Sequence, residues 1–161
     1  MKFENQSNPI KLATQATLTI GHRPNAKIIR AGNYTHLISL ISVREGADNL
    51  KESVKRFCPE TEYINLPFDN ANITLPEFKQ RLQLYLPNLL QLANGAQNNI
   101  YISCAAGIHR TGTVTYLLLR KLGYTPETAK ETISQLRMVT ALNMGEKRFN
   151  FIDELLTTNE L

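Results

Sequence analysis

The chain has 161 residues, 42% of them hydrophobic and 20% charged, with a net charge of +4 and only two cysteines, Cys58 and Cys104. This composition is that of one globular domain, 1–161, and it excludes a disordered chain and a disulfide-stapled scaffold. No apolar run approaches the roughly 20 residues of a membrane span, and no apolar signal segment opens the chain. We therefore expect a cytoplasmic protein with free thiols and no membrane span.

Strand and helix patterns alternate along the chain. In order, the predicted elements are strand Ala16–Ile20, helix Pro24–Arg30, strand Thr35–Ile41, helix Ala47–Phe57, strand Thr61–Leu66, helix Leu75–Ala93, strand Asn99–Ser103, helix Thr111–Leu122, helix Pro126–Arg137 and helix Glu146–Leu156. Pro87 inside the long helix predicts a kink or two shorter helices. The alternation predicts an α/β fold with a mainly parallel central sheet of four to five strands flanked by helices.

The most informative segment is ISCAAGIHRTGTV, residues 102–114, which joins the last predicted strand to a helix. Ligands of open α/β sheets bind at the carboxyl ends of the strands. The backbone N–H groups from Ala105 to Arg110 can form an anion-binding nest, and the following helix adds the positive end of its dipole. Cys104, at the rim of this nest, is therefore predicted to be a nucleophilic thiolate with a lowered pKa.

The side chains of Arg110 and Thr111 complete the predicted chemistry. The planar fork of Arg110 matches two oxygens of a phosphoryl group, and the Thr111 hydroxyl lies within reach of the thiolate. The backbone between Cys104 and Arg110 is predicted to bind the phosphate. It comprises Ala105, Ala106, Gly107, Ile108 and His109. The alternative is a buried core cysteine beside a surface arginine, but a core cysteine does not require Gly107 and Arg110 at this spacing.

The pattern Cys104-x-x-Gly107-x-x-Arg110-Thr-Gly resembles the signature loop of cysteine-dependent protein tyrosine and dual-specificity phosphatases, particularly their small atypical type. Gly-His-Arg-Pro at 21–24, Arg44-Glu45 after the THLISL strand, and the LPFDN loop occur in the same order as in that group. The resemblance spans about 17–156. It implies hydrolysis of phosphomonoesters through a phospho-cysteine intermediate, on phosphotyrosine and also phosphoserine or phosphothreonine proteins.

A general acid must protonate the leaving oxygen in such a reaction. Asp69 is the best candidate because it follows a strand and so lies at the carboxyl edge of the sheet. The resemblance implies an aspartate on a mobile loop, which then activates water to hydrolyse the phospho-cysteine. The alternative for Asp69 is an ordinary turn residue. No cofactor is expected, and no metal, because the histidines are scattered in the sequence.

The chain departs from the phosphatase pattern at Ser103, where the group usually has histidine. This departure predicts lower activity or a shifted pH dependence. The residue that positions water is unassigned, since Asn143 does not match cleanly. We interpret His109 as a surface residue. We interpret Cys58 as a buried residue with a structural role only.

Three readings of the function follow. The first is a phosphatase acting on phosphorylated proteins, with phosphate or another oxyanion in the site. The second is a catalytically weak phosphate-binding pseudophosphatase. The third is an inositol phosphate or RNA 5′-phosphatase, against which the absence of lysine from the loop argues. Scattered rather than clustered lysines and arginines argue against a nucleic-acid partner.

Overall fold

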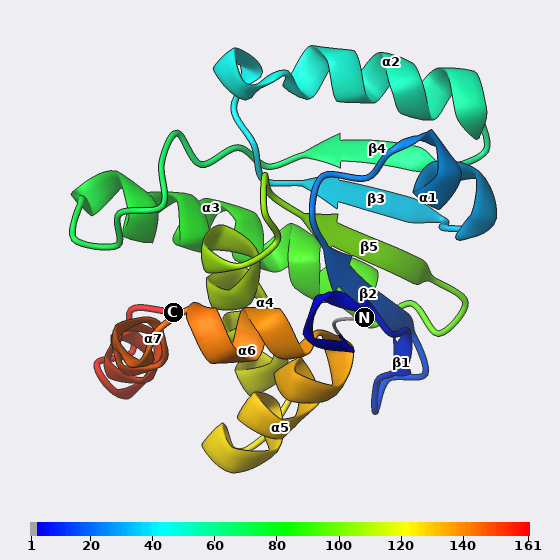
Figure 1. The fold of residues 1–161 in the computed structure, drawn as a ribbon. Coiled ribbons are helices and arrows are strands. Elements are labelled where there is room, and N and C mark those ends of the chain that lie inside the picture. The colour runs from blue at the N-terminus through cyan, green and yellow to red at the C-terminus, as the bar shows by residue number, and fades with distance from the viewer. Residues whose placement is uncertain (1–2) are drawn as a thin grey trace.

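The computed structural model describes residues 3–161 and has a five-stranded sheet at its centre (Figure 1). The strands are β1 (Ile10–Lys11), β2 (Thr17–Gly21), β3 (His36–Ser39), β4 (Glu62–Asn65) and β5 (Asn99–Ser103), in the order β1-β2-β5-β3-β4. All neighbours are parallel except β1 and β2. The predicted α/β fold with a mainly parallel sheet is thus confirmed.

The central strand, β5, explains where the loop after it must lie. Its residues pair with β2 on one side and β3 on the other, so that Ser103 is opposite both Gly21 and Ser39. From Ile100 to Ser103 every residue is buried. A strand enclosed in this way delivers the residue after it, Cys104, to the middle of the carboxyl edge.

Two 3₁₀ turns and seven α-helices surround the sheet. They are η1 (Phe3–Asn5), α1 (Ala26–Ala31), η2 (Val43–Glu45), α2 (Ala47–Phe57), α3 (Pro76–Ala93), α4 (His109–Lys121), α5 (Pro126–Leu136), α6 (Met138–Asn143) and α7 (Glu146–Thr157). Figure 1 shows α1 and α2 together beside β3 and β4, while α3, α5, α6 and α7 surround α4. Helix α4 is enclosed by these neighbours and is buried from Arg110 to Leu119.

The helix prediction was wrong in several places, each for a local reason. Pro76–Ala93 is one helix, so the alternative of two shorter helices was wrong; Pro87 is exposed, which leaves the unpaired carbonyl of the preceding turn open to water. Helix α4 begins at His109 instead of Thr111, so Arg110 belongs to its first turn. Helix α6 and strand β1 were not predicted, because six and two residues are too few to carry a hydrophobic period.

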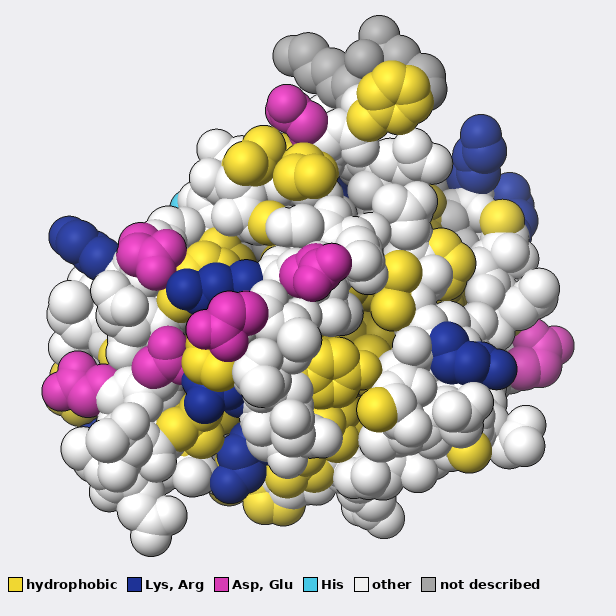
Figure 2. Space-filling view, turned by 90° about the horizontal axis from the view of Figure 1, so that it is seen from below, with side chains coloured by type: hydrophobic (Ala, Val, Ile, Leu, Met, Phe, Trp, Pro, Cys, Tyr) yellow, Lys and Arg dark blue, Asp and Glu magenta, His cyan; other side chains and the backbone are white. Residues whose placement is uncertain are grey.

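The surface charges agree with the sequence pattern. On the face shown in Figure 2, basic and acidic side chains are interspersed and hydrophobic side chains lie between them. Within residues 3–161, no helix combines the length and apolar character needed to cross a membrane.

Candidate active site

Three connections meet at the carboxyl edge of the parallel strands. They are the loop from β5 to α4, the turn η2 after β3, and the loop from β4 to α3 that carries Asp69. Contacts join all three: Arg110 of the first binds Glu45 of the second and the Phe68 carbonyl of the third. The candidate site is built where these connections touch.

Cys104 is buried at the start of the β5–α4 loop, with 4% of its surface exposed. Burial raises the pKa of its thiol, but the opposing interactions outweigh burial. These are the neighbouring hydroxyl and backbone N–H of Thr111, the positive charge of Arg110, and the backbone N–H of Gly107, all of which favour the thiolate. The pKa of Cys104 is therefore lower than its ordinary value, as the sequence predicted. A lowered pKa favours the thiolate, which is the nucleophilic form of a cysteine side chain.

Gly107 turns the loop in a way that only glycine can. Its φ is +71°, and a Cβ on it would lie 2.2 Å from the Gly21 carbonyl carbon and 2.6 Å from the His22 nitrogen. The loop is also fixed by a hydrogen bond of 3.0 Å from the Arg23 N–H to the Ala105 carbonyl. The Gly-His-Arg-Pro corner after β2 is thus a structural brace for the loop.

A second buried arginine, Arg137, binds backbone carbonyls of the same loop. Arg137 Nη1 donates to the carbonyls of Ala106 at 2.8 Å and Gly107 at 3.0 Å, and the Thr140 hydroxyl donates to the Gly107 carbonyl at 2.6 Å. Since a peptide's N–H points opposite to its C=O, tying these carbonyls aims the N–H groups of Gly107 and Ile108 the other way. Sequence analysis missed Arg137 and Thr140, which carry no local motif.

Arg110 is held by the carboxylate of Glu45. Its Nη1 and Nη2 each lie 2.7 Å from an oxygen of Glu45, and Nη1 donates to the Phe68 carbonyl at 2.9 Å. The hydrogen bonds from Arg110 hold the pKa of Glu45 at about 2, so this carboxylate is ionised at any physiological pH. This bidentate pair fixes the guanidinium plane beside Cys104.

The role of Glu45 was not assigned from the sequence, although a signal was present. Ser42-x-x-Glu45 forms a capping box at η2, with the Ser42 N–H 3.0 Å from Glu45 Oε1 and the Glu45 N–H 3.3 Å from Ser42 Oγ. A capping box directly after a buried parallel strand places its glutamate at the carboxyl edge. That combination predicts an acidic neighbour for Arg110.

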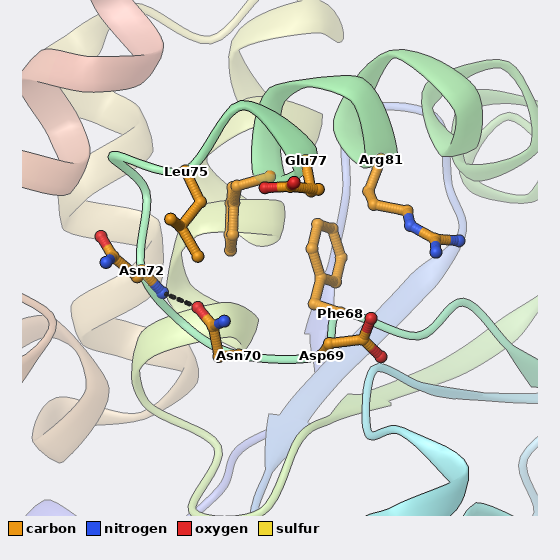
Figure 3. Close-up of a pocket in the computed structure, with 8 residues that line it drawn as sticks. Phe68, Asp69, Asn70, Asn72, Leu75, Glu77 and Arg81 are labelled. Atoms are coloured by element: carbon orange, nitrogen blue, oxygen red, sulfur yellow. Dashed lines mark hydrogen bonds between the residues drawn. The ribbon is translucent and has the colours of Figure 1, made fainter.

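Asp69 lies next to the residue that Arg110 contacts. It is exposed, and within residues 3–161 it has no hydrogen-bond or ion-pair partner. In Figure 3 its carboxylate turns away from Leu75 and Asn72. The sequence analysis thus placed it at the correct edge of the sheet, where its carboxyl group is free to meet a bound molecule.

Two hollows share Asp69 as a wall. One, of about 310 Å³, is lined by Phe68, Leu75, Phe78, Arg81 and other residues of the β4–α3 segment (Figure 3). The other, of about 550 Å³, is lined by Ser42, Val43, Arg44 and Pro67. Each offers apolar surface with one arginine, which suits a bound group larger than phosphate alone.

The remaining predicted residues differ in their surroundings. Ala105, Ala106 and His109 are exposed at the rim, whereas Thr111 is fully buried against the thiol. Ser103 is fully buried and its hydroxyl has no hydrogen-bond partner among the described residues. Asn143 lies on the exposed side of α6 and donates to the Val139 carbonyl at 2.9 Å.

Outside this edge of the sheet, the second cysteine lies apart from Cys104. Cys58 ends α2 before β4 begins, at the opposite edge of the sheet from Cys104, and both thiols are free. Within the part of the chain that the structure describes, no cluster of three His, Cys, Asp or Glu side chains has the arrangement of a metal site.

Comparison with solved structures identifies the fold. The structure of kinase-associated phosphatase with serine in place of its catalytic cysteine superimposes with a TM-score of 0.71 at 13% identity, covering 98% of this chain and 97% of that one. The catalytic core of the inositol pyrophosphate phosphatase SIW14 from S. cerevisiae gives 0.60 at 16%, covering 91% and 90%. PTPMT1 in complex with PI(5)P gives 0.55 at 15%, covering 94% and 98%.

At the level of sequence, no model of a known protein family matches the chain, and no curated protein matches it. The structural agreement extends over nearly the whole of both chains in each pair. The chain therefore has the fold of these phosphatases, as the resemblance of its segment 104–112 predicted.

Proposed function

We propose that the chain is a hydrolase that cleaves phosphomonoesters through a phospho-cysteine. The observation that carries the proposal is the pairing of a buried thiol of lowered pKa with an arginine fork already fixed beside it. The phosphatase fold supports the same reaction. Both the nucleophile and the phosphate-binding group are in place before substrate arrives.

In the first half of the reaction, the phosphoryl oxygens lie over the N–H groups from Ala105 to Arg110. The Cys104 thiolate attacks phosphorus and forms the S–P bond while the P–O bond to the leaving group breaks. Asp69, protonated, gives its proton to that leaving oxygen. Arg110 binds two equatorial oxygens as charge moves onto them.

In the second half, water attacks the phosphorus of the phospho-cysteine. The Asp69 carboxylate accepts a proton from this water as the S–P bond breaks, and phosphate is released. The Thr111 hydroxyl stabilises the departing thiolate, as its effect on the pKa of Cys104 suggests. The enzyme returns to its starting state with no cofactor or metal involved.

We propose a phosphorylated protein, carrying phosphotyrosine and also phosphoserine or phosphothreonine, as the substrate. The larger hollow beside Asp69 has Val43, Pro67 and Arg44 in its wall, and the smaller has aromatic and aliphatic walls with Arg81 and Glu77, which suits a peptide side chain and its neighbours. The loop itself contains no lysine to bind further phosphates. A panel of phosphopeptides, inositol phosphates and 5′-phosphorylated RNA tests this choice, and a preference for either of the last two would overturn it.

The reaction is tested by hydrolysis of p-nitrophenyl phosphate at pH 5 to 7. The wild-type chain should show turnover that vanadate inhibits, and Cys104→Ser should abolish turnover while phosphate binding persists. Absence of vanadate-sensitive turnover in the wild type would leave a phosphate-binding pseudophosphatase as the function. Asp69→Ala should lower the rate on a phosphotyrosine peptide by about 10²–10⁴-fold.

A further inference from the structure

The loop that carries Asp69 is anchored on both sides of that residue. On the N-terminal side, the Phe68 N–H donates to the Leu40 carbonyl at 3.0 Å and Arg110 binds the Phe68 carbonyl at 2.9 Å. The Phe68 ring is buried, with its centroid 4.6 Å from that of Phe78 and 5.5 Å from that of Tyr85. Motion at this end of the loop would therefore disrupt packed core residues.

On the C-terminal side, Ile73 packs against the hydrophobic core, and one arginine makes the polar connection. Arg148, in the first turn of α7, donates through Nη2 to the Ala71 carbonyl, two residues after Asp69. Its Nη1 donates to the Thr113 hydroxyl at 3.0 Å, and that hydroxyl donates to the His109 carbonyl at 2.7 Å. One half-buried guanidinium thus links the loop to the helix that carries Arg110.

The segment 70–74, which includes and follows the Ala71 anchor, is also locally ordered. The Asn72 N–H donates to Asn70 Oδ1 at 2.8 Å (Figure 3), and the Thr74 N–H donates to Asn72 Oδ1 at 3.0 Å. Asx turns of this kind set the local backbone but do not determine where the segment lies relative to α4. Arg148 contributes polar contacts to that placement, since its two terminal nitrogens reach the loop and the helix at once, and Ile73 adds apolar packing.

We infer that Arg148 is a positioning residue that holds the Asp69 loop against α4, the helix whose first turn carries Arg110, and so sets where the general acid lies relative to the nucleophile. The inference rests on the proposed function of Asp69 as the acid. It differs from the mobile loop that the resemblance to phosphatases implied. A preset acid avoids the cost of ordering a loop at each turnover.

The positive charge of Arg148 is a second way in which this residue could affect the reaction rate. Burial lowers the pKa of Arg148, and its charge and those of Cys104 and Arg110 affect one another. An effect through the thiolate would appear with every substrate. An effect through Asp69 would appear only where the leaving oxygen needs a proton. Substrates of different leaving groups therefore separate the two routes.

The test compares Arg148→Met with wild type on p-nitrophenyl phosphate, whose leaving group needs little protonation, and on phenyl phosphate. Lys147→Ala is the matched control, because Lys147 is the exposed neighbour on the same helix. Arg148→Met should lower kcat on phenyl phosphate by on the order of 10-fold or more, with a much smaller loss on p-nitrophenyl phosphate. The control should match wild type on both substrates.

The same substitution is then made in an Asp69→Ala background. If Arg148 acts by placing Asp69, its removal costs nothing further once Asp69 is gone. An equal loss on both substrates, a loss that persists without Asp69, or a neutral Asp69→Ala variant would overturn the inference. Thr113→Val, which removes one anchor of Arg148, should show the same leaving-group pattern more weakly if Arg148→Met fails to fold.

A readout independent of activity keeps this inference separate from the proposed reaction. Amide hydrogen exchange of the 69–74 segment should accelerate in Arg148→Met and not in Lys147→Ala, while the 104–110 loop stays protected. Unchanged exchange at 69–74 would contradict the anchoring role even in an active enzyme. A chain without turnover in which exchange accelerates would instead refute the proposed reaction and keep the anchor.

Discussion

Two buried arginines contact the Cys104 loop from opposite sides, and they do different things there. Arg110, on the ligand side, is paired with the Glu45 carboxylate, and this pairing raises the pKa of its guanidinium. Arg137, on the underside, binds the backbone carbonyls of Ala106 and Gly107, and burial lowers its pKa. Only the first has its charge balanced by an acidic side chain.

The difference shows that an arginine can serve either to bind a ligand or to hold the backbone of a loop in place. A guanidinium paired with a carboxylate can bring its fork to a phosphoryl group while its orientation is held. A guanidinium bound to neutral carbonyls instead fixes the loop's backbone and faces away from the ligand. We therefore expect substitutions of Arg110 to affect activity more than stability, and substitutions of Arg137 to affect stability first.

The largest effect is expected at Arg110. Arg110→Met should lower kcat/KM for p-nitrophenyl phosphate by about 10²–10³-fold, because it removes the charged donors that face the transition state. Steady-state kinetics measure the loss, and a urea titration should show that the variant still folds cooperatively. A variant with near wild-type turnover would mean that the phosphate is bound elsewhere.

At Arg137, the expected effect is on folding. Arg137→Met removes the charged donor to the carbonyls of Ala106 and Gly107, and hydrogen bonds to charged groups contribute about 1.5–3 kcal/mol to the free energy of unfolding. Thr140→Val removes one hydrogen bond and should cost about 1 kcal/mol. Urea denaturation provides both values. Wild-type stability in Arg137→Met, with activity lost, would reverse the roles assigned to the two arginines.

The pH dependence of thiol alkylation sharpens the comparison. In a Cys58→Ser background, iodoacetamide should modify Cys104 at a pH below the usual cysteine value of about 8.5, because a lowered pKa leaves more thiolate at neutral pH. Arg110→Met removes a positive charge near the sulfur, so its alkylation curve should move to higher pH. A curve that does not move would show that Arg110 does not act on the thiolate.

The smallest effect is expected at Ser103. Its hydroxyl is buried without a hydrogen-bond partner, and such a group destabilises a protein by about 1–3 kcal/mol. Ser103→Ala should therefore leave activity close to wild type and keep or raise the free energy of unfolding. A large fall in activity would instead assign this hydroxyl a role at the thiolate.

The parts of the site that sequence analysis predicted are those encoded locally. The spacing from Cys104 to Arg110 lies within one strand-turn-helix unit, and Asp69 directly follows a β-branched strand pattern. Local periodicity and the rule that ligands bind at the carboxyl ends of strands are enough to bring these residues to one edge. The alternation of strands and helices gave the fold for the same reason.

The parts that it missed are contacts between segments far apart in the chain. Glu45 lies 65 residues from Arg110, and Arg148 lies 77 residues from Ala71. No periodicity reports that a guanidinium from a late helix will reach an early loop. Helix α6, which carries Thr140, was not predicted because six residues are too few to show a hydrophobic period.

The central claim is that Cys104 carries the phosphoryl group during turnover, and trapping that group tests it most directly. Asp69→Ala should slow hydrolysis of the intermediate, so it is mixed with p-nitrophenyl phosphate and quenched in acid. Intact-mass analysis and peptide mapping should find one phosphoryl group on Cys104, and none in the Cys104→Ser variant. Turnover by the wild type with no label on Cys104, or with label on another residue, would contradict the account.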